Sequence, residues 1–212
     1  MVSDVAMAGN HWETVYNRNR EDEVSWFQGV PETSLAMIEA LDLEPDARII
    51  DIGGGASRLA DGLLNAGYRH ITVLDITEQA LQQSQARLGE RARLVEWIAA
   101  DVTTFQPDTT WDLWHDRAVF HFLVTEEARA GYRRTLERAL RPGGHVIIAT
   151  FGPHGPEKCS GLPVVRYDPE SLVAALGTDF TLCHTELEQH TTPAGQEQEF
   201  LYCWLQRSDR GE

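Results

Sequence analysis

The sequence predicts an α/β protein with one mostly parallel sheet and helices on both faces. Three observations support this fold class. Apolar runs typical of buried strands alternate with segments of helical periodicity through five rounds between residues 48 and 150. Three consecutive glycines directly follow the first of these runs. The last two predicted strands are joined by a short loop, which implies one antiparallel strand in the sheet.

The individual elements follow from hydrophobic spacing and from the residues that interrupt it. Leu35, Ile38 and Leu41 stand at helical spacing, which predicts a helix at 32–41, and Pro45 separates it from the first strand. Strands are predicted at 48–52, 70–75, 94–98, 111–115 and 145–150, with helices between them at 57–65, 78–88 and 126–140. A further helix is predicted at 169–176, and the closing pair of strands at 180–187 and 198–205.

Length and composition limit the possible functions. A chain of 212 residues is long enough for one domain with a sizeable core. The net charge of −15 disfavours nucleic acid and anionic membranes as partners, because binding to phosphate groups depends on Lys and Arg. The three cysteines show no CxxC spacing, so no zinc site is expected and reduced thiols in the cytoplasm are the simplest interpretation. No apolar run approaches the roughly 20 residues of a membrane span.

Glycines and carboxylates stand where the first three strands end. Gly53, Gly54 and Gly55 follow the first strand and allow a ligand to approach the backbone closely. Asp75 ends the second strand, where a carboxylate can accept hydrogen bonds from both hydroxyls of a ribose. Asp101 follows the third strand, where it could accept from an adenine amino group. Each acid alone could be a helix N-cap, but together these groups predict a site for an adenine nucleoside.

The charge next to the glycines bears on the choice between a dinucleotide and S-adenosylmethionine. A pyrophosphate site requires the GxGxxG pattern, and here Ala56 or Arg58 occupies the position of the third glycine, depending on the register. Asp51 would oppose a pyrophosphate, whereas a sulfonium with an amino-acid tail would tolerate or favour it. S-adenosylmethionine is therefore the expected cofactor. A nicotinamide-dependent oxidoreductase and a nucleoside-binding module without catalysis are the alternatives from other classes.

On these residues the chain resembles the class I S-adenosylmethionine-dependent methyltransferases. The resemblance is strong over 49–150 and rests on the glycine motif at 50–55, the acids Asp75 and Asp101, the segment 111–117 after the fourth strand and the Pro-Gly-Gly lead at 142–144. It implies a Rossmann-like sheet of seven strands in the order 3-2-1-4-5-7-6, with strand 7 antiparallel. It also implies an N-terminal lid or helical segment over residues 1–45 and a cofactor-binding methyltransferase domain over 46–207, within a single domain overall.

A set of cofactor-binding residues is expected from the motif positions, their neighbours and the aromatic segment near the N-terminus. That segment, 11–28, could close over the sulfonium and offer cation–π contact, as the resemblance suggests, or simply pack on the core. The expected cofactor-binding residues are Trp12, Tyr16, Trp26, Asp51, Gly53, Gly54, Gly55, Asp75, Ile76, Asp101, Val102 and His115.

The cluster after the fourth strand is expected to face the methyl group. His115, Asp116 and His121 are the candidate catalytic residues, with a histidine as general base and the aspartate orienting it or binding an amine. Backbone capping or salt bridges are the alternative roles, and no metal site is expected. The long loop at 151–167, which carries Cys159, is expected to form one wall of the acceptor pocket. The expected reaction is direct in-line transfer to a small-molecule acceptor, with a protein lysine as the alternative acceptor.

Overall fold

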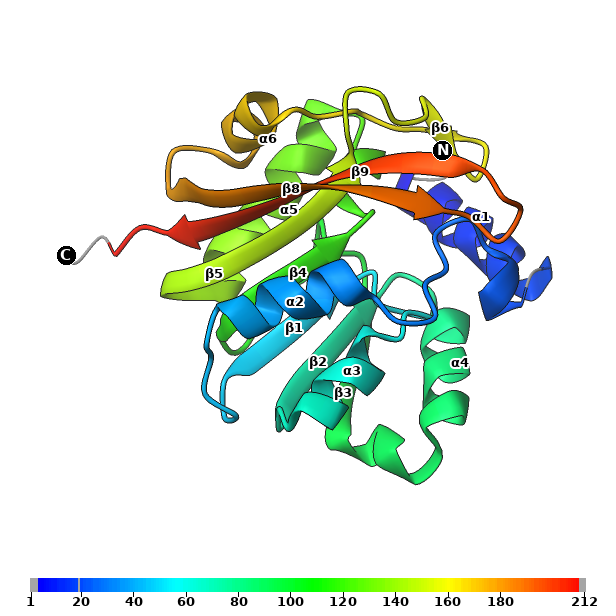
Figure 1. Ribbon diagram of the computed structural model, residues 1–212, viewed down its shortest axis with the longest axis horizontal. Coiled ribbons are helices and arrows are strands. Elements are labelled where there is room, and N and C mark those ends of the chain that lie inside the picture. Colours follow the sequence, from blue (N-terminus) through cyan, green and yellow to red (C-terminus); the bar gives the residue numbers. More distant parts are fainter. Residues whose placement is uncertain (1–3, 19, 210–212) are drawn as a thin grey trace.

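The computed structural model describes residues 4–18 and 20–209 and contains a seven-stranded sheet in the order β3-β2-β1-β4-β5-β9-β8 (Figure 1). The first five of these strands pair in parallel, while β9 is antiparallel to both β5 and β8. The predicted strand order and the reversed strand are therefore confirmed. The strands are β1 (Arg48–Ile52), β2 (His70–Asp75), β3 (Val95–Ala99), β4 (Trp111–Arg117), β5 (Leu140–Phe151), β8 (Phe180–Thr191) and β9 (Glu197–Arg207).

Helices cover both faces of the sheet. In Figure 1, α2 lies in front of β1, while α5 lies behind the sheet. The helices are α1 (Asp4–Arg18), α2 (Glu32–Ala40), α3 (Leu59–Ala66), α4 (Glu78–Leu88), α5 (Glu126–Ala139) and α6 (Pro169–Leu176). Short 3-10 helices occur at η1 (Glu21–Glu23), η2 (Gly89–Leu94) and η3 (Phe120–Phe122).

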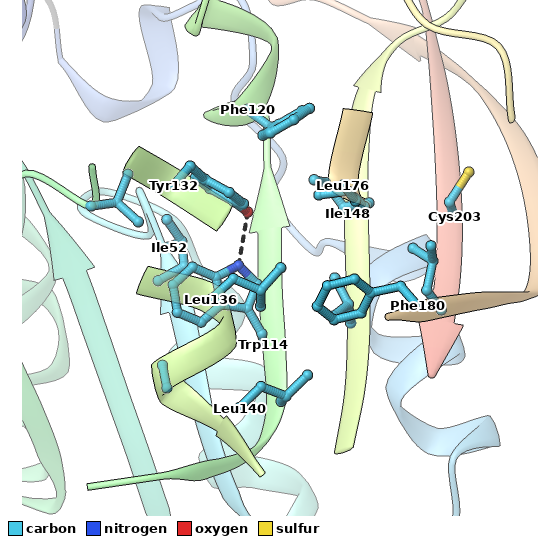
Figure 2. Packing of buried hydrophobic residues seen from close by; sticks show 14 of the residues in the cluster. Ile52, Trp114, Phe120, Tyr132, Leu136, Leu140, Ile148, Leu176, Phe180 and Cys203 are labelled. Atoms are coloured by element: carbon cyan, nitrogen blue, oxygen red, sulfur yellow. Dashed lines mark hydrogen bonds between the residues drawn. The ribbon is translucent and has the colours of Figure 1, made fainter. Parts of the chain in front are cut away.

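The hydrophobic core divides into two layers, one on each face of the sheet, because successive strand residues point to opposite faces. Ile50 and Trp114 belong to the layer that also holds buried residues of α5 and α6. Ile49 and Leu113 belong to the layer beneath α2 and α3. Figure 2 shows the first layer at the sheet, with the side chains of Trp114, Tyr132 and Phe120 close together. Asp51 and His115 are each two residues from the inward-facing residues of the second layer and share that face.

Several element boundaries differ from the sequence prediction. β5 begins at Leu140 and passes through the Pro-Gly-Gly segment, because Leu140 pairs with Trp111 across an irregularity in β4. β8 extends to Thr191, and the loop after β5 contains the short strands β6 (Lys158–Cys159) and β7 (Leu162–Pro163). α1 contains the first part of the aromatic segment 11–28 and lies within the stretch that was expected to be a lid or helical segment, although no bounds were predicted for a helix there. The predicted N-terminal segment 1–45 includes residues 1–3 and 19, which lie outside the described residues.

None of the described helices is long and apolar enough to cross a membrane.

Candidate functional site

A cavity of about 340 Å³ opens at the carboxyl ends of β1, β2 and β4. Its volume lies in the range that ligand sites occupy, and ligands of open α/β sheets bind at this edge. Eight of the expected cofactor residues line it, namely Trp12, Tyr16, Trp26, Gly53, Asp75, Ile76, Asp101 and Val102. The structure therefore brings these eight residues together around one cavity, and their role in binding a cofactor stays a prediction.

The glycine loop has no space for side chains. Gly53 has φ +66, and a Cβ there would overlap Val119, which follows β4. A Cβ on Gly54 would overlap the Asp51 carboxylate, and one on Gly55 would collide with Ala80 and Asp75. The backbone is held from the other side by Ser84 of α4, whose Oγ donates to the Gly55 carbonyl over 2.5 Å. Glycine at these positions thus lets β1, α4 and the loop after β4 meet around the cavity.

Asp75 lies at the end of β2 with its side chain against the glycine loop. Its Oδ2 accepts from the Gly55 N–H over 3.1 Å, and its Oδ1 accepts from the N–H and hydroxyl of Thr77 over 2.8 and 3.0 Å. Burial raises its pKa to about 6, although these hydrogen bonds oppose the shift. A carboxylate fixed in this way on the cavity wall can accept hydrogen bonds from a ribose.

Asp101 lies farther along the same wall, beyond β3. Its Oδ1 accepts from the N–H and hydroxyl of Thr103, both over 2.7 Å, and the residue is only half-buried. Ile76 and Val102, next to the two acids, contribute apolar surface to the cavity. The wall therefore alternates acceptors with apolar side chains, which suits the edge and faces of a purine.

Aromatic side chains from the N-terminal segment form the opposite wall. Trp12 contacts Trp26 and Phe122 edge-on, with ring centroids 5.6 and 5.0 Å apart, and Tyr16 contacts Trp26 at 6.2 Å. Trp12 and Tyr16 are four residues apart on α1, so they point from one face of that helix. The rings both line the cavity and pack against one another at the core, and closure of this segment over a sulfonium stays a prediction.

The segment after α1 is anchored by hydrogen bonds and ion pairs to the rest of the domain. Arg117 at the end of β4 donates through Nη1 to the Trp26 carbonyl over 3.0 Å, and Gln28 donates to Glu188 over 2.7 Å. At the glycine loop, Glu21 pairs with Arg58 over 2.7 Å and with Arg87 over 2.5 Å. Burial disfavours the charged form of Glu21, but the hydrogen bonds from Arg58 and Arg87 outweigh it and lower its pKa.

We expect Glu21→Gln to weaken the binding of S-adenosylhomocysteine about 3- to 10-fold, because a half-buried ion pair contributes more than an exposed one. Without the ion pairs of Glu21 with Arg58 and Arg87, the segment that carries Trp26 is no longer anchored near the glycine loop. Isothermal titration calorimetry measures the effect. Glu13→Gln removes the same charge from an exposed position on α1 and serves as the control. Equal affinities for the two variants would contradict the anchoring role.

His115 does not face the large cavity, contrary to the expectation that it faces the methyl group. Its Nδ1 lies 2.7 Å from Asp51 Oδ1, and its Nε2 lies 2.9 Å from Ser34 Oγ of α2. The ring is 2% exposed. Because both nitrogens have internal partners, the geometry does not present the imidazole as a base to a substrate.

A smaller cavity of about 40 Å³ shares Tyr16, Trp26 and Gly53 with the lining of the large one. Four of the expected cofactor residues do not line the large cavity. Asp51, Gly54 and His115 line the small cavity instead, and Gly55 lines neither. Two buried polar atoms in its lining residues have no hydrogen-bond partner, Oδ2 of Asp51 and Nε of Arg58. An unpaired acceptor and an unpaired donor on residues that line one cavity suit a zwitterion, since buried polar groups normally have partners.

Asp116 is fully buried on the opposite face of β4. Its carboxylate accepts from the N–H groups of Val119 and Phe120 over 2.9 and 3.2 Å and from the Tyr132 hydroxyl over 2.7 Å. Burial raises its pKa to about 6, against the effect of those hydrogen bonds. Asp116 therefore shapes the loop that holds Val119 against Gly53, and the structure does not bring it to the cavity.

His121 is also buried away from the cavity, so the three candidate catalytic residues do not converge. It packs against Phe122 and Phe151, and its Nδ1 accepts from the Phe151 N–H over 3.2 Å. Burial, with a smaller contribution from the Arg117 charge, lowers its pKa to about 3.

The buried histidine predicts a dependence of stability on pH. The unfolded chain protonates His121 near pH 6.5, whereas the folded protein does not, so its contribution to stability is lost as pH falls from 6.5 toward 3. Between pH 7.5 and 5.0 the titration of His121 should lower the free energy of unfolding of the wild type by about 2 kcal/mol, and the His121→Asn variant should not show this loss. Urea unfolding of both proteins at the two pH values isolates this term from the opposing effects of Asp75 and Asp116. If the difference in the free energy of unfolding between the wild type and His121→Asn were the same at both pH values, the folded protein would protonate His121 like the unfolded chain, contrary to the prediction.

Ala118, Val119 and Phe122 line the cavity from the segment after β4 and were not singled out from the sequence, and Arg117 lines it from the end of β4. Cys159 and Leu162 line it from β6 and β7, within the loop 151–167 that was expected to form a wall of the acceptor pocket. Ala118 has φ 73, an uncommon conformation for a residue with a Cβ, where the chain leaves β4. The described residues contain no group of His, Cys, Asp and Glu arranged to hold a metal ion.

Fold and cavity together define an α/β protein with a nucleoside-type site at the tips of its parallel strands. Residues 49–144 match the family model described as a methyltransferase domain. These 96 of the 212 residues are the methyltransferase domain that the resemblance implied, and S-adenosylmethionine is the cofactor that the match supports.

Relatives and solved structures extend this comparison. An eEF1A lysine and N-terminal methyltransferase of Mus musculus is 26% identical over 143 residues, which are 66% of this chain but only 20% of the relative. The 1,6-didemethyltoxoflavin-N1-methyltransferase of Burkholderia thailandensis, solved with its substrate and S-adenosylhomocysteine, superposes with a TM-score of 0.72 at 20% identity, covering 96% of this chain and 89% of that one. A structure from work on the conversion of a disulfide bond into a thioacetal group during echinomycin biosynthesis gives a TM-score of 0.79 at 18% identity, covering 97% and 94%. At these identities the superpositions show a shared fold.

Proposed function

We propose that the protein transfers the methyl group of S-adenosylmethionine to a small-molecule acceptor by direct in-line displacement. The observation that carries the proposal is the convergence of Gly53, Asp75 and Asp101, from three adjacent strand ends, on a cavity whose other wall is aromatic. When bound, the cofactor supplies an electrophilic methyl group on a positively charged sulfur.

The donor half of the site has a partner for each part of the cofactor. Asp75 accepts hydrogen bonds from the ribose, and Asp101 accepts from the adenine amino group between Ile76 and Val102. In the small cavity, the free Oδ2 of Asp51 accepts from the ammonium of the amino-acid tail, and Arg58 Nε donates to its carboxylate. These assignments explain why both atoms are buried without partners in the protein.

The acceptor half lies between the aromatic wall and the loop after β4. Trp12, Trp26 and Phe122 present ring surfaces that favour a flat apolar body and a neighbouring cation. His115, Asp116 and His121 form hydrogen bonds within the protein interior. The acceptor atom should therefore have a free lone pair when it binds, so that none of these residues is needed to remove a proton from it. The chain then contributes alignment and exclusion of water.

A protein acceptor is the second candidate. Two observations favour it: the chain carries a net charge of −15, which attracts basic segments, and the mouse relative is named as a lysine and N-terminal methyltransferase. The cavity argues against it, because its described lining is mostly apolar near Trp12 and Phe122.

A methyl-transfer screen tests the function. The protein is incubated with S-adenosylmethionine labelled on the methyl group, together with fractionated metabolites in one arm and lysate proteins in the other. Label in a small-molecule product supports the proposal, and label only in protein supports the second candidate. Calorimetry with S-adenosylhomocysteine and NAD runs alongside, and micromolar NAD binding without a response to the adenosyl ligand would contradict both candidates.

A further inference from the structure

Three buried side chains form a continuous hydrogen-bonded chain that ends at the small cavity. Ser34 of α2 is joined to His115 of β4, and His115 to Asp51 of β1, over the 2.9 and 2.7 Å already described. Asp51 and His115 are register partners on adjacent parallel strands, so their side chains emerge side by side on one face of the sheet. None of the three is more than 2% exposed.

The donors and acceptors of this chain can be assigned in one consistent way. Asp51 as a carboxylate only accepts, so His115 Nδ1 carries the proton that is shared with Oδ1. In the neutral ring Nε2 then has a lone pair, and the Ser34 hydroxyl donates to it. Among the side-chain polar atoms of Ser34, His115 and Asp51, only Oδ2 of Asp51 has no hydrogen-bond partner.

We propose that Ser34 and His115 are positioning residues, which orient Asp51 so that its Oδ2 receives the ammonium group of the cofactor's amino-acid tail. This inference rests on the proposed function and assigns a role to two residues that do not line the large cavity. Imidazole on Oδ1 prevents the carboxylate from rotating, so Oδ2 stays directed toward Gly54, where a Cβ would overlap it. The role replaces the general-base role that the sequence suggested for His115.

The small cavity contains further charges that make the orientation of Asp51 important. Arg117 and Arg58 line it together with Glu21, and Asp75 lies close enough to Asp51 for their charges to interact. Glu21 is already paired with Arg58, and Arg117 is 3.5 Å from Glu188. A carboxylate free to turn could pair with one of these arginines instead of the ligand. The His115 ring, held by Ser34, keeps Asp51 available.

Two ligands that share the adenosine part separate this role from a purely structural one. S-adenosylhomocysteine has the amino-acid tail, and 5′-methylthioadenosine lacks it, so calorimetry with both reports on the small cavity alone. We expect His115→Leu to weaken S-adenosylhomocysteine binding about tenfold or more, while 5′-methylthioadenosine binding stays within about twofold. His115→Asn keeps a donor for Asp51 and should restore S-adenosylhomocysteine binding to within about threefold of wild type.

Further variants complete the test. In an Asp51→Asn background, His115→Leu should change S-adenosylhomocysteine affinity less than about twofold, because the two residues act as one unit. Thr150→Val removes another buried hydroxyl, away from the small cavity, and is the control. Equal loss of both ligands in His115→Leu and His115→Asn, or no loss of either, would overturn the positioning role. Failure of the wild type to bind S-adenosylhomocysteine would instead contradict the proposed function.

Discussion

Replacing Asp75 with asparagine should reduce the affinity for S-adenosylhomocysteine roughly 100-fold, the largest effect we expect on binding. The carboxylate is proposed to accept two ribose hydroxyls, and hydrogen bonds to a charged acceptor contribute about 1.5 kcal/mol or more each, or about 3 kcal/mol together. The amide also places N–H donors against the Gly55 and Thr77 donors that the carboxylate accepts. Calorimetry at pH 7.5 measures the change.

The comparison between ligands and between acids makes the Asp75 result specific. Asp75→Asn should weaken 5′-methylthioadenosine as strongly as S-adenosylhomocysteine, unlike the His115 variants, because both ligands contain the ribose. Asp101→Asn is the matched variant, and its effect should be about tenfold or less because Asp101 is half-exposed. An Asp75→Asn protein that unfolds at the wild-type temperature and binds either ligand within about threefold of wild type would refute the assigned ribose contact.

The largest expected effect on stability is that of Tyr132→Phe. The Tyr132 hydroxyl accepts from the Trp114 indole N–H over 2.8 Å (Figure 2) and donates to Asp116 Oδ2 over 2.7 Å. All three side chains are fully buried. Without the hydroxyl, the indole N–H is unpaired and the charged carboxylate loses a donor. Such losses cost about 1–3 kcal/mol per buried group, so we expect about 3 kcal/mol in total and a melting temperature lower by roughly 6–12 °C.

The pH dependence of this variant gives a second readout. The pKa of Asp116 is raised to about 6 in the wild type, so protonating it favours the folded state as pH falls from 6 toward 3.8. Removing Tyr132's hydroxyl should raise this pKa further, and the difference in stability between the two proteins should therefore shrink at pH 5. Tyr68→Phe, which removes a partly exposed hydroxyl, should change stability by less than about 0.5 kcal/mol. A Tyr132→Phe protein as stable as this control would contradict the buried network.

Local sequence signals located the parts of the site that depend on one strand end at a time. The glycines, Asp75 and Asp101 each follow a predicted strand, and the parallel arrangement brings such positions to one edge of the sheet. The aromatic wall was also indicated by composition. The segment was expected to be a lid or helical, but the bounds of its helix were not predicted, although Trp12 and Tyr16 are spaced to share one helical face.

The orientation of side chains around β4 could not be predicted from the sequence, because it depends on register and on distant elements. His115 was expected to face the acceptor, but the pairing of β1 with β4 places Asp51 beside it and α2 brings Ser34 to its other nitrogen. Asp116 points to the opposite face because strand residues alternate, and there it meets Tyr132 of α5. The short β6 and β7 strands likewise position Cys159 through pairing within a loop.

A crystal structure of the protein with S-adenosylhomocysteine is the most direct test of the adenosyl site. The account predicts the ribose hydroxyls within hydrogen-bonding distance of Asp75, the adenine between Ile76 and Val102, and the amino group at Oδ2 of Asp51. Density for the ligand anywhere outside the cavity at the ends of β1, β2 and β4 would contradict it.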